Sequence, residues 1–243
     1  MKAKLFTPLI FLLVGVSWLL CQAADHLVFE AGSGPGQGKH IVFLAGDEEY
    51  RSEEAMPLLA EIMSAQGFKC TVLFSIDEKS GFIDSNNQKS LTNPSALDSA
   101  DGIVMSLRFR NWNDSAMAKF DAALQRGIPF VALRTSTHAF KIDASSKWAK
   151  YSFNSKADTG WTKGFGREVL GETWVSHHGK HKGQGARGVL EQENSKHPIL
   201  NNVKDLFAPS DVYGVKHLTK DDQILMRGAV TETLDPSSKN IEG

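Results

Sequence analysis

The sequence predicts an α/β fold, in which a mostly parallel, doubly wound sheet carries helices on both faces. Short apolar runs alternate with stretches whose apolar residues recur at helical spacing, which is the pattern of strand–helix–strand units. Each apolar run is nearly continuous, as expected of strands buried on both faces. The 243 residues are enough for one large domain with a sizeable core.

The first stretch, residues 1–23, is predicted to be a secretory signal peptide. Two lysines precede the apolar residues 5–20, and residues 21–23 form a small-x-small cleavage pattern. We expect cleavage after Ala23 or Ala24, a periplasmic or secreted protein, and no membrane contact afterwards. An uncleaved anchor is disfavoured because the apolar run is short for a membrane span. A lipid on the cysteine of the cleavage pattern is disfavoured because small residues do not precede it.

Charge and cysteine content exclude some classes of protein. Without the signal peptide, Lys+Arg falls from 27 to 25 against 28 Asp+Glu, a net charge near −3. This balance gives no sign of nucleic-acid binding. The mature chain keeps only Cys70, so it has no internal disulfide, and this cysteine lies in an alternating apolar run. We predict that Cys70 is buried and unreactive.

The first elements follow in order. The Gly-rich residues 24–38 are expected to be a flexible lead-in to a domain at 39–243. The first buried strand is predicted at 40–46 and is followed by a polar loop. Apolar residues at helical spacing then predict a helix that ends at Gly67. Pro57 places the regular start of this helix nearer Glu54 than Ser52, because an interior proline loses a hydrogen bond.

The pattern repeats before it becomes less regular. Strands are predicted at 68–76 and 102–107, separated by a long polar connection. A helix capped by Asn113 or Asp114 then leads to the fourth strand, 128–133. Shorter strand candidates in the second half are 172–176, 188–191, 212–216 and 224–230.

Polar side chains follow several of the predicted strands at their carboxyl ends. In a parallel sheet these ends lie at one edge, where ligands bind. We therefore expect the loop after the first strand, Arg108 and Arg110, and residues 134–138 to share one rim. His177 and His178 join them if 172–176 is another such strand. Arg134 needs a carboxylate or a substrate oxygen beside it, and we expect Glu48 or Glu49 to be its protein partner.

This set of carboxylates, arginines, hydroxyls and histidines suits general acid/base work on a polar substrate. We expect His138 and His178 to transfer protons, with Glu49 as a carboxylate partner. The residues expected to bind substrate oxygens are Asp47, Glu48, Tyr50, Arg51, Arg108, Arg110, Arg134, Thr135, Thr137 and His177.

Structural interpretations of the same residues stay open. The acidic run after the first strand is also typical of a solvated surface, and the arginines are also typical structural partners of these carboxylates. His138 also suits a packed turn. The spacing of His177, His178 and His181 is compatible with metal binding, but no Cys or paired carboxylate follows at a diagnostic interval, so we assign no metal and no cofactor.

Two kinds of chemistry are disfavoured. A strand followed by a sharp turn and a helix is typical of a nucleophile elbow, but Arg134 occupies the nucleophile's position. An always-protonated guanidinium is no covalent nucleophile, so a covalent hydrolase is disfavoured. The first strand is also not followed by a Gly-rich phosphate loop.

Five blocks of the sequence carry a resemblance to a known family. They are residues 44–54, 108–110, 133–140, 165–175 and 177–179. Taken together they resemble the ThuA-like (trehalose-utilisation) family and, more narrowly, its exported branch in planctomycete-type bacteria. This resemblance implies a flavodoxin-like sheet similar to that of class I glutamine amidotransferases. The amidotransferase cysteine would fall at Arg134, so glutaminase activity is not implied.

The resemblance links the chain to disaccharide and keto-sugar metabolism. We therefore expect an exported protein, a hydrolase or lyase, that acts on a small carbohydrate or oxidised sugar by non-covalent acid/base chemistry. The alternatives are a non-catalytic sugar-binding module and a metal-dependent hydrolase that uses His177, His178 and His181. Relatives continue past the equivalent of Gly243, so the resemblance implies further strands and a helix. The sequence predicts no oligomeric state.

Overall fold

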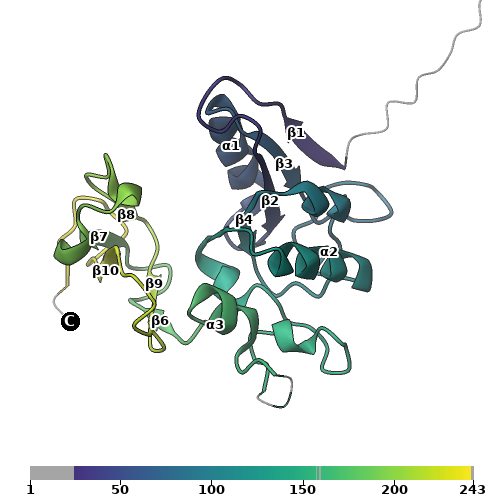
Figure 1. Ribbon diagram of the computed structural model, residues 1–243. Helices are drawn as coiled ribbons and strands as arrows, with labels where there is room; N and C mark the ends of the chain where they lie inside the picture. Colours follow the sequence, from purple (N-terminus) through teal and green to yellow (C-terminus); the bar gives the residue numbers. More distant parts are fainter. Residues whose placement is uncertain (1–24, 157, 159, 242–243) are drawn as a thin grey trace, which may run out of the picture.

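The computed structural model describes residues 25–156, 158 and 160–241. A sheet with its helices forms the larger part, and short strands from β6 onward form a smaller part beside it (Figure 1). The predicted signal peptide, residues 1–23, lies outside the described residues. Among the helices of the described ranges, none combines the length and the apolar character that a membrane crossing requires.

The central sheet has five strands in the order β1-β3-β2-β4-β5. The last four pair in parallel, and β1 pairs antiparallel with β3 at one edge. The predicted mixed α/β fold with a mostly parallel sheet is therefore confirmed, whereas a doubly wound, flavodoxin-like arrangement stays a prediction. The strands are β1 (His26–Phe29), β2 (His40–Gly46), β3 (Lys69–Leu73), β4 (Gly102–Leu107) and β5 (Phe130–Ala132).

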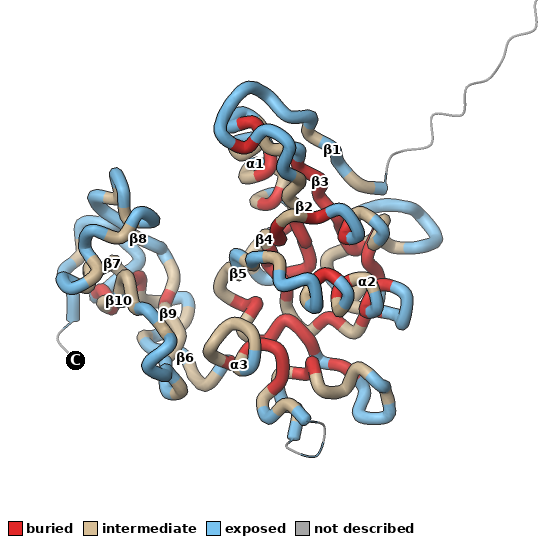
Figure 2. Tube along the Cα trace, in the orientation of Figure 1, coloured by how far each residue is buried: buried red, intermediate tan, exposed pale blue. Residues whose placement is uncertain are grey.

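Alternate residues of β2 point into two separate cores. Phe43 packs in one cluster with Met56 of α1 (Ser52–Ala65), and Leu44 packs in the other with Phe120 of α2 (Asp114–Gln125). Successive residues of a strand face opposite sides of the sheet, so these two helices cover opposite faces. Figure 2 shows that most of the buried residues lie in the sheet and in the segments that flank it.

Two expectations near the amino end are corrected. Residues 24–38 were expected to be a flexible lead-in, yet β1 pairs with β3 and the Gly36 amide donates to the Gln66 carbonyl at 2.9 Å. Gly34 sits so close that a Cβ would lie 2.3 Å from the same carbonyl oxygen, so the glycines allow this stretch to pack on the end of α1. The helix itself begins at Ser52, whose hydroxyl accepts the Asp47 amide at 2.8 Å, with Pro57 inside it.

The second half is built of short elements. Residues 172–176 were predicted as a strand, but the strand is β6, which follows them. The Glu172 carboxylate accepts hydrogen bonds from the backbone amides of Lys216 at 2.7 Å and His217 at 2.8 Å. Hydrogen bonds to this side chain therefore take the place of backbone pairing between strands. The other helices of the described ranges are η1 (Pro94–Ser99), η2 (Arg134–His138), η3 (Ala149–Tyr151), α3 (Gly164–Leu170), η5 (Gln192–Asn194) and η6 (Pro198–Leu200).

The smaller part contains two small sheets. β6 pairs antiparallel with β9, and β7 lies between β10 and β8 in a three-stranded sheet. These strands are β6 (His177–His178), β7 (Ala186–Leu190), β8 (Phe207–Ala208), β9 (Val212–Tyr213) and β10 (Met226–Val230).

Candidate functional site

The loops that follow β2, β4 and β5 meet at the carboxyl edge of the sheet. Arg108, after β4, donates a hydrogen bond to Glu48 in the loop after β2, and its Nε lies 3.4 Å from Glu49 Oε2. Thr135 of η2, after β5, donates its hydroxyl hydrogen to the carboxylate of Asp47. The three loops therefore share one rim, as the parallel arrangement of the strands predicted.

Arg110 lies under this rim and is fully buried. Its NH2 group donates to Glu48 Oε2 at 3.1 Å, and its Nε donates to the Arg108 carbonyl at 2.7 Å. Its NH1 group donates to the carbonyls of Ser85 at 3.1 Å and Asn87 at 3.2 Å in the long connection after β3. Every nitrogen of the guanidinium thus makes a hydrogen bond within the protein. Arg110 therefore joins loops and does not face a substrate, which agrees with the structural interpretation of this residue.

Asp47 also has a structural role. Its side chain is fully buried, and Oδ1 accepts the amides of Glu49 at 2.9 Å and Tyr50 at 3.3 Å. Its other oxygen accepts the hydroxyl of Thr135, which is equally buried. A short Asp side chain that bonds to amides two and three residues on is an Asx turn. Asp47 and Thr135, expected to bind substrate, therefore shape the loop that carries Glu49 and Tyr50.

Arg134 connects the rim to the smaller part of the chain. Its guanidinium stacks between the rings of Tyr50 and Tyr213, 4.6 and 4.5 Å from their centroids. It donates to the backbone carbonyl of Asp211 and, at 3.0 Å, to Asp211 Oδ1. The prediction that Glu48 or Glu49 pairs with Arg134 is therefore wrong. Glu48 is already held by two other arginines, and Asp211 is delivered by a strand far along the sequence.

Three residues that end or follow the parallel strands have left-handed backbone conformations. They are Arg51, Phe109 and Arg134, with φ of 51°, 53° and 33°. Such values are uncommon outside glycine and cost of order 1–3 kcal/mol each. Among the described residues, three of the seven non-glycine residues with positive φ thus lie at this edge of the sheet.

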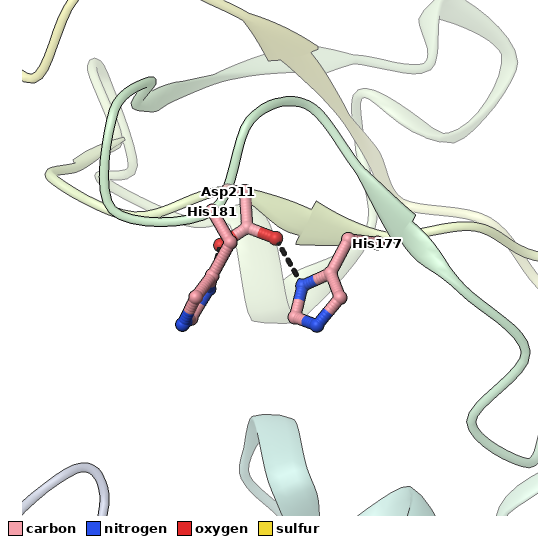
Figure 3. A group of neighbouring side chains, drawn as sticks. All are labelled: His177, His181 and Asp211. Carbon is pink, nitrogen blue, oxygen red and sulfur yellow. Dashed lines mark hydrogen bonds and ion pairs between the residues drawn. The ribbon is translucent and has the colours of Figure 1, made fainter.

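Asp211 holds two histidines, and Figure 3 shows both rings on one side of it. His177 Nδ1 lies 2.5 Å from Asp211 Oδ2, and His181 Nδ1 lies 3.0 Å from Oδ1. The other nitrogen of His181, Nε2, lies 3.2 Å from Glu49 Oε1 on the rim. Burial raises the pKa of Asp211, but hydrogen bonds from His181 and His177 and the charge of Arg134 outweigh it and hold this pKa below its usual range. The buried Asp211 is therefore an anion.

His138, at the end of η2, lies among aromatic rings. Its ring centroid is 5.0 Å from that of Phe109, 5.8 Å from Tyr213 and 6.0 Å from Trp174. Burial, and then the positive charges of nearby arginines, lower the pKa of His138 to about 4. This imidazole is therefore neutral at pH 7.

Three of the expected residues lie elsewhere. The exposed His178 lines a groove between the strands of the smaller part, together with Val189 and Val212. Neighbouring residues of a strand face opposite sides, so His177 reaches the rim and His178 does not. Arg51 is exposed and pairs with Glu54 one turn along α1. Thr137 lines an apolar hollow beside β5 and α3.

Sequence reasoning missed Asp211 and Tyr213. Asp211 directly precedes the strand predicted at 212–216, and this position was the available signal. The pairing of β9 with β6, which brings Asp211 beside His177, has no signature in the sequence.

One solved structure similar to this chain is that of a protein from Bacteroides uniformis ATCC 8492 described as ThuA-like. It has 14% sequence identity and a TM-score of 0.49, and the match covers 81% of this chain and 69% of that chain. No family model and no curated protein matches the chain. The chemistry of the site is therefore inferred from its own residues.

Proposed function

We propose that the chain acts on a small carbohydrate or an oxidised (keto) sugar by non-covalent acid/base chemistry, with His177 as the proton-transferring group. The contact of 2.5 Å between His177 Nδ1 and the buried Asp211 carries this proposal. A carboxylate that accepts the Nδ1 hydrogen fixes the tautomer and orientation of the ring and leaves the lone pair on Nε2. The His177 side chain is 36% exposed, so this nitrogen is within reach of a substrate.

His138 supplies a second, differently tuned imidazole. The rings of His138 and His177 share two neighbours, Trp174 and Tyr213. One histidine is oriented by a carboxylate, and the other is kept neutral by burial and by arginine charges. Titratable groups whose surroundings differ in this way are typical of acid and base pairs. In the proposed reaction His177 Nε2 removes a proton from the substrate, holds it as an imidazolium beside Asp211 and then returns it to the leaving oxygen, while the neutral His138 lines the site.

The guanidinium groups of Arg108 and Arg134 place positive charge at the rim. Each already pairs with a carboxylate, and their side chains are 27% and 20% exposed. Charged donors of this kind suit the hydroxyl or carbonyl oxygens of a sugar. Trp174, which is 36% exposed, offers an aromatic ring of the kind on which sugars stack.

The location and the family are part of the same proposal. The charged, apolar and small-residue order of residues 1–23 supports export to the periplasm or beyond. The motif blocks around residues 44–54 and 133–140 support membership of the exported ThuA-like branch.

The test is turnover of a panel of disaccharides and 3-keto-glycosides by the mature chain, with products followed by mass spectrometry. His177→Gln should lower kcat by about 100-fold or more, since general acid/base catalysis contributes about that factor. Asp211→Asn should also lower kcat. His178→Gln changes the neighbour of His177, which lies outside the rim, and should leave kcat unchanged. Sugar binding without turnover would favour the sugar-binding module instead, and full activity in His177→Gln would refute the assigned role.

A further inference from the structure

We propose that His177, His181 and Asp211 form a binding site for a divalent transition metal, with zinc as the best match. One ligand atom of each residue lies within 4.8 Å of the others. Figure 3 shows the two imidazole rings side by side below the carboxylate. Two imidazole nitrogens and a carboxylate oxygen are a ligand set that zinc accepts, and three protein ligands leave one position open. This inference does not rest on the proposed acid/base function.

The backbone brings the three ligands together through rigid pairing. β6 and β9 pair so that His178 is opposite Val212, which places Asp211 at the end of β6. Gly179 then turns the chain with a φ of 97°, and a Cβ there would lie 3.2 Å from Val230. This turn returns His181 to the side of His177, with 4.7 Å between the ring centroids.

The surroundings of His181 are the strongest sign of a metal. Its Nδ1 lies 3.0 Å from Asp211 Oδ1 and its Nε2 lies 3.2 Å from Glu49 Oε1, so each ring nitrogen faces a carboxylate. A neutral imidazole has one N–H and cannot donate to both, whereas an imidazolium has two. A metal on Nδ1 satisfies both carboxylates without the second proton, because Asp211 then binds the metal and Nε2–H is donated to Glu49. This is the carboxylate–histidine–metal arrangement that orients metal ligands in proteins.

Spacing and charge agree with a cation at this place. Donor atoms about 2.0–2.2 Å from a zinc ion lie roughly 3–3.5 Å from one another. The Nδ1–Oδ separations of 2.5 and 3.0 Å need only a small expansion to reach this spacing. With neutral imidazoles, four carboxylates of the rim face three guanidinium groups, which leaves an excess negative charge. The carboxylates are Asp47, Glu48, Glu49 and Asp211, and the guanidinium groups are Arg108, Arg110 and Arg134.

A bound metal changes what His177 is able to do. When Nδ1 of His177 binds the metal, the remaining proton lies on Nε2, and this nitrogen no longer accepts a proton from a substrate. The metal-loaded form and the base-competent form therefore exclude each other. Zinc is expected to inhibit the acid/base reaction proposed above.

The experiment uses the mature chain after treatment with a chelator. Zinc is titrated by calorimetry, and cobalt is titrated by visible absorption, whose intensity reports a low coordination number. We expect one metal ion per chain. His181→Ala should weaken zinc binding by at least about 100-fold, and Glu49→Gln, which removes only the outer carboxylate, by about 10- to 100-fold.

Two matched controls keep the result specific. His178→Ala removes the adjacent histidine, and His217→Ala removes a histidine that pairs with Glu172 elsewhere, at 2.6 Å. Both should bind zinc as the unchanged chain does. Thermal melting of metal-free His181→Ala checks that the variant is folded.

The outcomes separate the two proposals. Absence of zinc binding by the unchanged chain, or equal binding by His181→Ala, overturns the metal site and leaves the acid/base function standing. Stoichiometric binding that inhibits turnover supports both proposals. Stoichiometric binding that is required for turnover supports the site and refutes the metal-free mechanism, in favour of a metal-dependent hydrolase.

Discussion

Acidification from pH 7 to pH 5 should destabilise the fold through His138. The folded protein holds this imidazole at a pKa of about 4, below the ordinary value of 6.5, chiefly because it is buried. Between these two values the unfolded chain binds a proton that the folded chain does not bind. Stability therefore rises with pH across this window, and it is lost as the pH falls from 6.5 towards 4.

The size of the effect follows from the two pKa values. The full difference corresponds to about 3 kcal/mol, at about 1.4 kcal/mol for each unit of pKa. At pH 5 His138 is protonated in almost every unfolded chain and in about one folded chain in ten. About 2 kcal/mol of the His138 contribution to the free energy of unfolding is therefore already lost at pH 5. The side chain is only 5% exposed, so solvent screening reduces this figure little.

The assay is urea unfolding of the unchanged chain and of His138→Gln at pH 7 and pH 5. His138→Gln removes this titration, so its free energy of unfolding should fall by about 2 kcal/mol less than that of the unchanged chain. His178→Gln, at an exposed position, should follow the unchanged chain. Parallel losses in the unchanged chain and in His138→Gln would refute the reasoning.

Three further outcomes are expected. Arg110→Ala leaves Glu48 and two loop carbonyls without their buried partner, so the free energy of unfolding should fall by about 3–5 kcal/mol in urea titration; a loss below 1 kcal/mol would contradict this. Gly166→Ala places a Cβ 2.1 Å from the Thr137 carbonyl oxygen and should lower the melting temperature, and an unchanged value would count against the packing of α3 on η2. The thiol of Cys70 is buried and its pKa is raised to about 11 by that burial, so a thiol reagent should label it only after unfolding; rapid labelling of the folded protein would disprove this.

The parallel sheet was predictable because each of its strands is an apolar run bounded by clear breaks. Residues 40–46 match β2 in full, and 102–107 match β4. The edge strand β1 was missed because the sequence 26–29 is short and precedes a Gly-rich stretch. β5 is shorter than predicted, since Leu133, whose amide still donates to the Met105 carbonyl of β4, is already the N-cap of η2.

The position of the rim was predictable from the topology of a parallel sheet, but the contacts within the rim were not. Parallel strands deliver their following loops to one edge, which brought Glu49 and Arg108 together. The choice between His177 and His178 depends on a register shift of one residue, which a two-residue strand does not specify in sequence. The Arg134–Asp211 pair joins positions 77 residues apart through a strand pairing that no local pattern predicts.

The left-handed backbone at Arg134 has a consequence for attempts to engineer this protein. Glycine adopts a φ of 33° without the Cβ penalty, so Arg134→Gly would relieve local strain while removing the side chain that bridges Asp211 and two tyrosines. The strained backbone and the bridging side chain of this residue therefore act on stability in opposite directions. Selection for heat resistance alone would not preserve the contacts on which the proposed ligand binding depends, so selection schemes need to score binding as well.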